Sequence, residues 1–283
     1  MDGFSAKSVS ALLTEHGIRT SKSKGQNFLI DGNIPEKIVR LAGFGGNDGV
    51  LEIGAGLGIL TLALSRAAGR VVSAELDARL LPILDNILAD ANNVDLVPGD
   101  ILKMDIKKLV YEKMPGLKHH VCANLPYNIT TPILTGLINA GIFETITVMI
   151  QNEVAQRVCA QPGAAAYGAF SIFVKYHAEP ETLFIVPPEC FMPRPGVYSA
   201  VVKLSMRKER ILAHDEEAMF FRVVRAAFAQ RRKTLVNALY AAFGATHQKE
   251  AITALVRKCG FDERIRGEML GVEDFIKLSE FIA

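Results

Sequence analysis

Apolar positions follow two alternating patterns through the first half of the chain. Short apolar runs that end in glycine, aspartate or asparagine, such as GVLEIGAG (49–56) and HHVCAN (119–124), are typical of buried strands. Between them, longer stretches carry apolar residues at the three- and four-residue spacing of a helix. The patterns predict strands at 49–56, 70–76, 94–100, 119–124 and 145–151, and helices at 59–69, 78–90 and 130–141. Because βαβ units build parallel sheets covered on both faces, we expect a doubly wound α/β domain.

The second half of the chain changes pattern. Two strand-like runs, 181–188 and 197–206, leave no room for a helix between them and predict an antiparallel hairpin at the edge of the sheet. Beyond residue 207 only helical patterns follow, at 215–230, 234–244, 248–260 and 272–282. We therefore expect two domains: the α/β domain over residues 1–208, and a small all-α C-terminal domain over residues 209–283.

Composition restricts the class of protein. With 283 residues, 49% of them hydrophobic, the chain has enough apolar side chains for a sizeable core. A net charge of +2 means that any nucleic-acid footprint must be local. The four cysteines (Cys122, Cys159, Cys190, Cys259) are far apart and the histidines are scattered, so we expect reduced thiols and no metal site. Without a signal-peptide core or an apolar run of roughly 18 residues, we expect a soluble, cytoplasmic protein with no membrane association.

Three glycines follow the first predicted strand in LEIGAGLGIL, at Gly54, Gly56 and Gly58. Glycine lets the backbone approach a ligand closely at the carboxyl end of a parallel strand, where open α/β sheets bind ligands. A dinucleotide fingerprint would place the third glycine one residue later, at Ile59. The observed spacing, preceded by the acidic Glu52, favours a ligand without a pyrophosphate.

Two acids end the next predicted strands. Glu75 lies 21 residues after Gly54, where a carboxylate can accept hydrogen bonds from both ribose hydroxyls. Asp100 ends the third strand and is placed to meet an adenine amino group. Glycines and acids in strand order therefore predict an adenosine ligand without phosphates, and S-adenosylmethionine fits that description.

Motifs along nearly the whole chain resemble those of the ribosomal RNA adenine dimethyltransferases, in particular the KsgA (RsmA) type that acts on bacterial small-subunit RNA. The motifs are QNFL (26–29), LEIGAGLG, AELD, GDIL and NLPYNI (124–129), followed by FMPRPGVYSAVVKL and RAAFAQRRKTLVNAL. The resemblance implies a class I, Rossmann-like methyltransferase fold. It also implies that S-adenosylmethionine contacts Gln26, Asn27, Leu29, Gly54, Gly56, Glu75, Leu76, Asp100, Ile101 and Asn124.

The NLPY segment is the catalytic motif that the resemblance implies, comprising Asn124, Leu125, Pro126 and Tyr127. The exocyclic nitrogen of adenine is a poor nucleophile because its lone pair is delocalised into the ring. If the Asn124 side-chain oxygen and the Leu125 carbonyl accept its two N–H bonds, the lone pair is aimed at the methyl donor, and no strong base is needed. Tyr127 is expected to stack on the target base, with Phe191 on the opposite face.

Basic residues that could grip RNA phosphates occur in two clusters. The C-terminal cluster comprises Arg222, Arg225, Arg231, Arg232 and Lys233, and the N-terminal cluster comprises Arg19, Lys22 and Lys24. On a helical wheel all of the C-terminal cluster except Arg231 fall opposite Phe221, Val224 and Phe228, a pattern that a solvated helix face explains almost as well. Arg231 would face the apolar side of an unbroken helix, so either the helix ends near Gln230 or Arg231 sits in a polar network.

The resemblance implies a monomeric enzyme of ribosome biogenesis that dimethylates N6 of two adjacent adenines in a 3′-terminal hairpin of 16S rRNA, within the small subunit or its precursor. Two alternatives remain. One is the related class that methylates 23S rRNA and confers antibiotic resistance. The other is a non-catalytic relative that binds RNA or acts in transcription, against which the intact NLPY and the acids at the strand ends argue.

Overall fold

The computed structural model describes residues 5–18, 27–209 and 211–282, and its contacts divide the chain into two compact units. The first unit comprises Met1–Ala155 and Glu181–Met206, and the second comprises Gln156–Pro180 and Arg207–Ala283. The second unit thus takes in a segment, Gln156–Pro180, that the sequence pattern did not assign to the helical C-terminal part.

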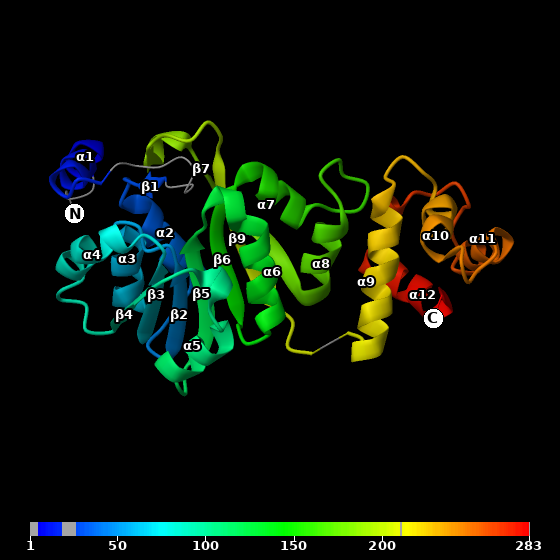
Figure 1. The fold of residues 1–283 in the computed structure, drawn as a ribbon, viewed down its shortest axis with the longest axis horizontal. Helices are drawn as coiled ribbons and strands as arrows, with labels where there is room; N and C mark the ends of the chain where they lie inside the picture. Colours follow the sequence, from blue (N-terminus) through cyan, green and yellow to red (C-terminus); the bar gives the residue numbers. More distant parts are fainter. Residues whose placement is uncertain (1–4, 19–26, 210, 283) are drawn as a thin grey trace. The chain divides into compact units, whose positions relative to one another are not determined.

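A seven-stranded sheet organises the first unit, in the order β4-β3-β2-β5-β6-β9-β7 (Figure 1). The strands are β2 (Asp48–Ile53), β3 (Arg70–Glu75), β4 (Val94–Pro98), β5 (Lys118–Asn124), β6 (Thr145–Gln151), β7 (Ala178–Val186) and β9 (Ser199–Met206). The first five pair in parallel, so the doubly wound α/β prediction is confirmed. Parallel pairing brings the carboxyl ends of β2, β3 and β5 to one edge of the sheet.

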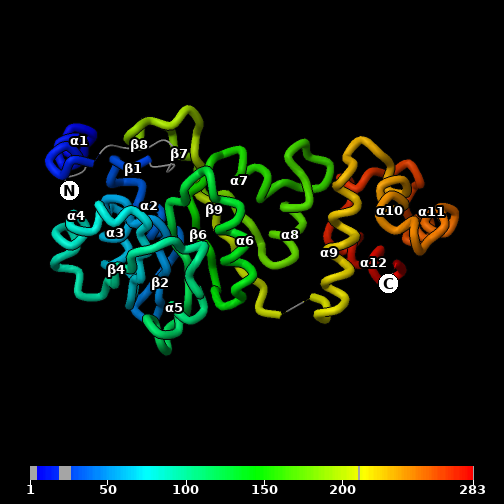
Figure 2. The backbone as a smooth tube through the Cα atoms, viewed as in Figure 1, coloured from blue at the N-terminus to red at the C-terminus, as the bar shows by residue number. Residues whose placement is uncertain are grey.

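The predicted antiparallel edge is also confirmed, and the later strand of the two, β9, is the inner one. β9 runs antiparallel to β6, with Ser199 opposite Gln151, and β7 lies beyond β9 at the edge. The connection between β7 and β9 carries a short strand, β8 (Phe191–Met192), which pairs antiparallel with β1 (Phe28–Leu29) in a separate sheet. Figure 2 shows these two segments, distant in sequence, lying side by side.

Helices of the first unit supply much of its core. They are α1 (Ala6–Glu15), α2 (Asn33–Ala42), α3 (Ile59–Ala67), α4 (Leu81–Ile87), α5 (Ile106–Lys113) and α6 (Thr130–Ala140). Every residue of β2 after Asp48 is buried, as expected for a strand covered on both faces. Val50 and Val71 share one core with Ile38 of α2 and Leu64 of α3.

The second unit is helical. Its helices are α8 (Ala169–His177), α9 (His214–Ala229), α10 (Leu235–Phe243), α11 (Lys249–Lys258) and α12 (Val272–Ile282), with part of α7 (Asn152–Cys159). Gln156–Pro180 belongs to this unit because Tyr167 and Tyr176 are buried in one core with Phe220 and Phe275. Over the described residues, no helix is both long enough and apolar enough to cross a membrane.

Candidate active site

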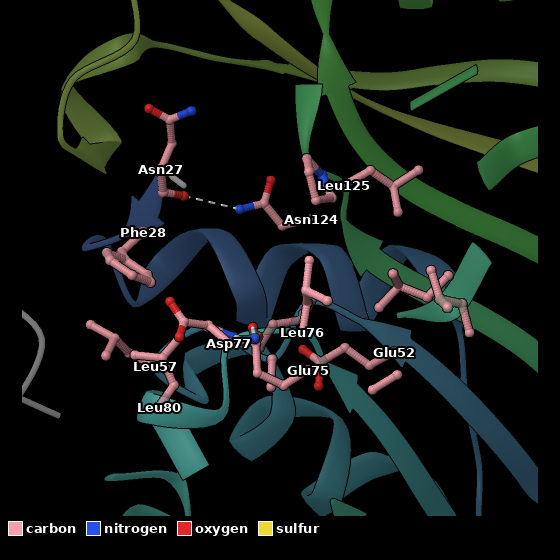
Figure 3. A pocket seen from close by; sticks show the side chains of 18 of the residues that line it. Asn27, Phe28, Glu52, Leu57, Glu75, Leu76, Asp77, Leu80, Asn124 and Leu125 are labelled. Carbon is pink, nitrogen blue, oxygen red and sulfur yellow. Dashed lines mark hydrogen bonds between the residues drawn. The ribbon is translucent and has the colours of Figure 1, made fainter. Parts of the chain in front are cut away.

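A cavity of about 1060 Å³, counted to include its open mouth, lies at the carboxyl ends of the parallel strands (Figure 3). Its walls come from the segments that follow β2, β3, β4 and β5, together with β1. Most residues singled out from the sequence line it: Asn27, Leu29, Gly54, Gly56, Glu75, Leu76, Asp100, Ile101, Asn124, Leu125, Pro126 and Tyr127. Residues distant in sequence are therefore brought to one space by the strand order.

The glycine loop after β2 forms the floor of the cavity. Gly54 and Gly56 have φ values of +78° and +59°, a backbone region that only glycine adopts without strain. A Cβ atom at Gly56 would lie 3.4 Å from the Phe28 ring, and one at Gly54 would lie 3.8 Å from the Asn124 carbonyl oxygen. The loop therefore passes close to both β1 and the end of β5, and side chains there would narrow the cavity.

The carboxylate of Glu75, the last residue of β3, accepts hydrogen bonds from backbone amides in the loops that follow β2 and β3. The Gly56 N–H donates to its Oε2 at 2.9 Å, and the Asp77 N–H donates to its Oε1 at 2.8 Å. Burial raises the pKa of the Glu75 carboxyl, and the two amide hydrogen bonds oppose that rise. Each oxygen keeps a further lone pair, so the carboxylate can still accept hydrogen bonds from a ligand's hydroxyls.

Glu52 is a second carboxyl in the cavity wall, and it is only 1% exposed. The hydroxyls of Thr61 and Ser73 each donate to its Oε2 at 2.6 Å. Burial raises the pKa of Glu52 to about 7, against the opposing effect of these two hydrogen bonds. Sequence reasoning had noted Glu52 before the glycines without assigning it to the site.

Asp100 and Asp77 complete the acidic part of the wall. Asp100 caps the turn that follows β4, since the Leu102 N–H donates to its Oδ1 at 3.1 Å. Asp77, which sequence reasoning missed, accepts hydrogen bonds from the Arg79 guanidinium at 2.8 and 2.6 Å. Its position two residues after Glu75, in AELD, was the one available signal. Phe28, Leu57, Leu80 and Ile133 also line the cavity; the first two lie within the QNFL and LEIGAGLG motifs but were not singled out, and the other two lie in no motif.

Asn124 ends β5 on the opposite side of the cavity, and its amide is held in one orientation (Figure 3). The Nδ2 atom donates to the backbone carbonyl oxygen of Asn27 at 3.3 Å. Because this bond occupies the nitrogen end of the amide, the oxygen is the end left to accept a hydrogen bond in the cavity.

Tyr127 follows on the same loop and lines the cavity, and its hydroxyl is 2.6 Å from Ser199 Oγ. Burial raises the pKa of the Tyr127 phenol, so the side chain is neutral near neutral pH. Leu125 is 1% exposed, and its backbone N–H donates to Met149 of β6 at 3.1 Å. Leu125 therefore fixes the loop to the sheet.

Phe191 is not brought to the cavity. Its side chain is 2% exposed and packs in the core with Leu29 and Val186, because β8 pairs Phe191 directly with Leu29. The structure therefore does not place this ring opposite Tyr127 across the cavity.

The basic residues of the second unit lie around α9. Arg222, Arg225, Arg232 and Lys233 are exposed, and the Arg222 guanidinium lies 4.6 Å from the centre of the Phe243 ring. Arg231 is engaged elsewhere: it donates to the carbonyl oxygens of Ala165 and Tyr167 at 3.0 and 3.1 Å. The two explanations offered for Arg231 both hold, since α9 ends at Ala229 and the guanidinium joins a polar network.

Four of the predicted residues, Arg19, Lys22, Lys24 and Gln26, lie outside the described residues. Within the described ranges, no group of three or more His, Cys, Asp or Glu side chains could hold a metal ion.

Comparisons with known proteins point to one family. A family model described as ribosomal RNA adenine dimethylase matches residues 17–283. Proteins named ribosomal RNA small subunit methyltransferase A, from Shouchella clausii and Lactiplantibacillus plantarum, are 44% and 45% identical to this chain. The two matches span 96% and 95% of this chain and 93% and 92% of those proteins.

Two solved structures are similar over nearly their whole length. A dimethyladenosine transferase from Plasmodium falciparum has a TM-score of 0.77 and 26% identity, over 89% of this chain and 95% of that one. The 23S rRNA methyltransferase ErmE has a TM-score of 0.73 and 25% identity, over 90% of this chain and 99% of that one.

Proposed function

The chain belongs to the ribosomal RNA adenine dimethylase family, and we propose that it dimethylates N6 of two adjacent adenines in the 3′-terminal hairpin of 16S rRNA. As a member of that family it is an S-adenosylmethionine-dependent rRNA adenine dimethyltransferase. The choice of small-subunit RNA is supported by the relatives named for the small subunit, which are 44% and 45% identical over almost the whole chain. We propose that the enzyme acts as a monomer in the cytoplasm, on the small subunit or its precursor.

The hydrogen-bond acceptors of the cavity suit S-adenosylmethionine. The Glu75 carboxylate lies at the end of β3, where it can accept from the two ribose hydroxyls, and Asp100 lies at the end of β4, near where an adenine amino group would sit. The glycine loop leaves the floor open between them. Bound there, the cofactor supplies an electrophilic methyl group. We propose that Asn27, Leu29, Leu76 and Ile101 complete its binding surface.

The observation that carries the catalytic proposal is the fixed amide of Asn124. Its nitrogen is bound to Asn27, so its oxygen is available to accept one N–H of the target amine. With the Leu125 carbonyl accepting the other N–H, the lone pair of the amine is held out of the ring plane. The groups are neutral and take no proton, because the methylated product is acidic enough to release its proton to water. Rate then comes from orientation, which can contribute about 7 kcal/mol or more.

Tyr127 supplies the flat surface against which the extruded adenine stacks, and such stacking is worth roughly 1–3 kcal/mol. The phenol is neutral, so it presents its ring and no charge to the base. Pro126 fixes the backbone directly before it. Phe191 would have to leave its core position to stack on the opposite face, so we assign the stacking to Tyr127 alone.

Methylation of large-subunit RNA is the second candidate, because the ErmE structure is almost as similar in fold as the dimethyladenosine transferase. One experiment separates the two. The protein is incubated with labelled S-adenosylmethionine and either unmethylated small subunits or large subunits, and the label is mapped by mass spectrometry of RNA fragments. Label in N6,N6-dimethyladenine at two adjacent positions of 16S rRNA supports the proposal; label confined to the large subunit overturns it.

A further inference from the structure

The hydroxyl of Tyr127 is held by a residue outside the cavity. Tyr127 Oη and Ser199 Oγ are 2.6 Å apart, and Ser199 is fully buried, with 0% of its surface exposed. Tyr127 lines the cavity, whereas Ser199 does not. The hydroxyl therefore points away from the space in which a base would stack, and the ring is the part of the side chain that faces it.

The two partners differ in how firmly the fold fixes them. Ser199 begins β9 and pairs with Gln151 of β6, two residues along from Met149, which is opposite Asn124 of β5. Its side chain has a single rotatable carbon–carbon bond and is fully buried, so its oxygen has few alternative positions. Tyr127 instead begins a three-residue 3-10 turn (Tyr127–Ile129) after the end of β5. Its ring has two torsions and no strand partner to restrict them.

We propose that Ser199 is a positioning residue for methyl transfer: by holding the Tyr127 hydroxyl, it fixes the plane of the ring on which the target adenine stacks. The inference rests on the proposed function, because it takes the stacking role of Tyr127 as given. The strand order makes this contact possible: β9 pairs with β6, which lies between β9 and β5, and this places Ser199 beside the loop that follows β5. Ser199 acts on the RNA side of the site alone, so cofactor binding does not depend on it.

The test is a double-mutant cycle on unmethylated small subunits, with Ser199→Ala, Tyr127→Phe and both together. A neutral hydrogen bond contributes modestly, so each single variant is expected to raise KM for the subunit by about threefold to tenfold. kcat should fall less, and the cofactor Kd should stay within about twofold of the parent value. Because both changes remove the same bond, the double variant should be no worse than either single one.

Two further variants separate positioning from packing. Ser199→Thr keeps a hydroxyl and should restore most of the KM. Ser205→Ala makes the same chemical change on the exposed side of β9 and should behave as the parent does. If Ser199→Ala does not fold, Tyr127→Phe alone decides, since it removes the bond from the partly exposed side and keeps an aromatic ring at that position.

The outcomes distinguish this inference from the function on which it rests. Multiplicative effects in the double variant, or a parent-like KM for Tyr127→Phe, overturn the positioning role of Ser199. Tyr127→Ala in the same assay tests the stacking itself. If Tyr127→Ala is impaired while Tyr127→Phe and Ser199→Ala are not, only the present inference fails. A Tyr127→Ala variant with parent kcat and KM would remove the stacking proposal as well.

Discussion

The two sides of the cavity are built from equivalent positions in the sheet but carry opposite chemistry. The side formed after β2, β3 and β4 presents four carboxyl groups, those of Glu52, Glu75, Asp77 and Asp100. The side formed after β5 presents an amide, an apolar side chain, a proline and a neutral phenol. All of them lie at or shortly after the carboxyl ends of neighbouring parallel strands, so topology alone does not explain the difference.

The difference teaches how one cavity separates binding from reaction. The carboxylates accept hydrogen bonds from amides and hydroxyls, and they suit a ligand rich in hydroxyl and amino groups. The β5 side needs acceptors that aim an amine without removing its proton, and uncharged oxygens meet that need. If this division holds, changes on the acidic side should alter cofactor affinity or stability, and changes on the β5 side should alter the rate.

The largest effect is expected from Asn124→Ala. The change removes one acceptor that orients the amine, so single-turnover methylation of small subunits should fall about 100-fold or more, on the scale of roughly 2.7–4 kcal/mol for one preorganised polar contact. Cofactor affinity, measured by calorimetry, should fall only modestly because the acidic side is intact. Asn128→Ala is the matched control: the same residue type, on the same loop, exposed and outside the cavity lining. A parent-like rate for Asn124→Ala would mean that the amide does not orient the substrate.

Glu52→Gln should change how stability depends on pH. The folded-state pKa of Glu52 is about 7, against 4.5 for a free side chain, so the folded protein holds a proton that the unfolded chain releases. The resulting contribution to the free energy of unfolding is fully present below about pH 4.5 and is lost as pH rises through about 7. It amounts to at most about 3 kcal/mol. Urea unfolding at about pH 5 and about pH 8 should therefore show a larger loss of stability for the parent than for the variant. Equal pH dependence in the two proteins would show that Glu52 is ionised throughout.

Glu75→Ala should weaken S-adenosylmethionine binding by about 2 kcal/mol, through the loss of charge-assisted bonds to the ribose. Glu75→Gln keeps acceptor oxygen for the Gly56 amide and should lose less. Glu112→Gln, on the exposed surface of α5, removes the same charge away from the cavity and should leave affinity unchanged. Calorimetric Kd values that do not move for Glu75→Ala would contradict the assignment of the acidic side to the cofactor.

The smallest effect is expected outside both sides of the cavity. Neutralising Arg222, Arg225 and Arg232 together should reduce the slope of log affinity against log salt by roughly one unit per lost phosphate contact. Neither the single-turnover rate at saturating RNA nor cofactor affinity should change. Neutralising Lys249, Arg257 and Lys258 on α11 changes net charge equally and serves as the control. An unaltered slope would mean that these three arginines form only a solvated surface.

Two of the four carboxyl groups on the acidic side could be predicted from sequence, because the strands that carry them follow one another in order; Asp77 and the place of Glu52 in the site were not predicted. Glu75 and Asp100 end apolar runs, and Gly54 and Gly56 follow one, so local pattern and parallel topology together place them. The role of the motif after β5 was inferred from the family resemblance. Neither the residue pattern nor the resemblance predicted the orientation of the Asn124 amide, because its hydrogen-bond partner Asn27 is 97 residues away. Phe191 entered the core instead of the cavity because of a two-residue pairing, β1 with β8, that is too short to give a periodic signal.

The same limit applies to the second unit. Gln156–Pro180 joins it through Tyr167 and Tyr176, whose burial depends on partners in α9 and α12. The Tyr167 hydroxyl donates to the Leu270 carbonyl oxygen at 2.7 Å, a contact between residues 103 positions apart. Periodicity reports which face of a helix is apolar, but it does not report which distant helix will cover that face.

The place of β9 between β6 and β7 has a consequence for how the sheet can form while the chain is being synthesised. β7 is synthesised before β9, but in the sheet it lies on the far side of β9 from β6. It therefore cannot take its final position until β9 has paired with β6. Until Ser199–Met206 has been synthesised, the nascent sheet therefore ends at β6 with an unpaired edge, a surface prone to mispairing with other chains. The strand that covers this edge also begins with Ser199, so the pairing of β9 with β6 brings in the side chain that holds Tyr127 at the same time as it protects the edge.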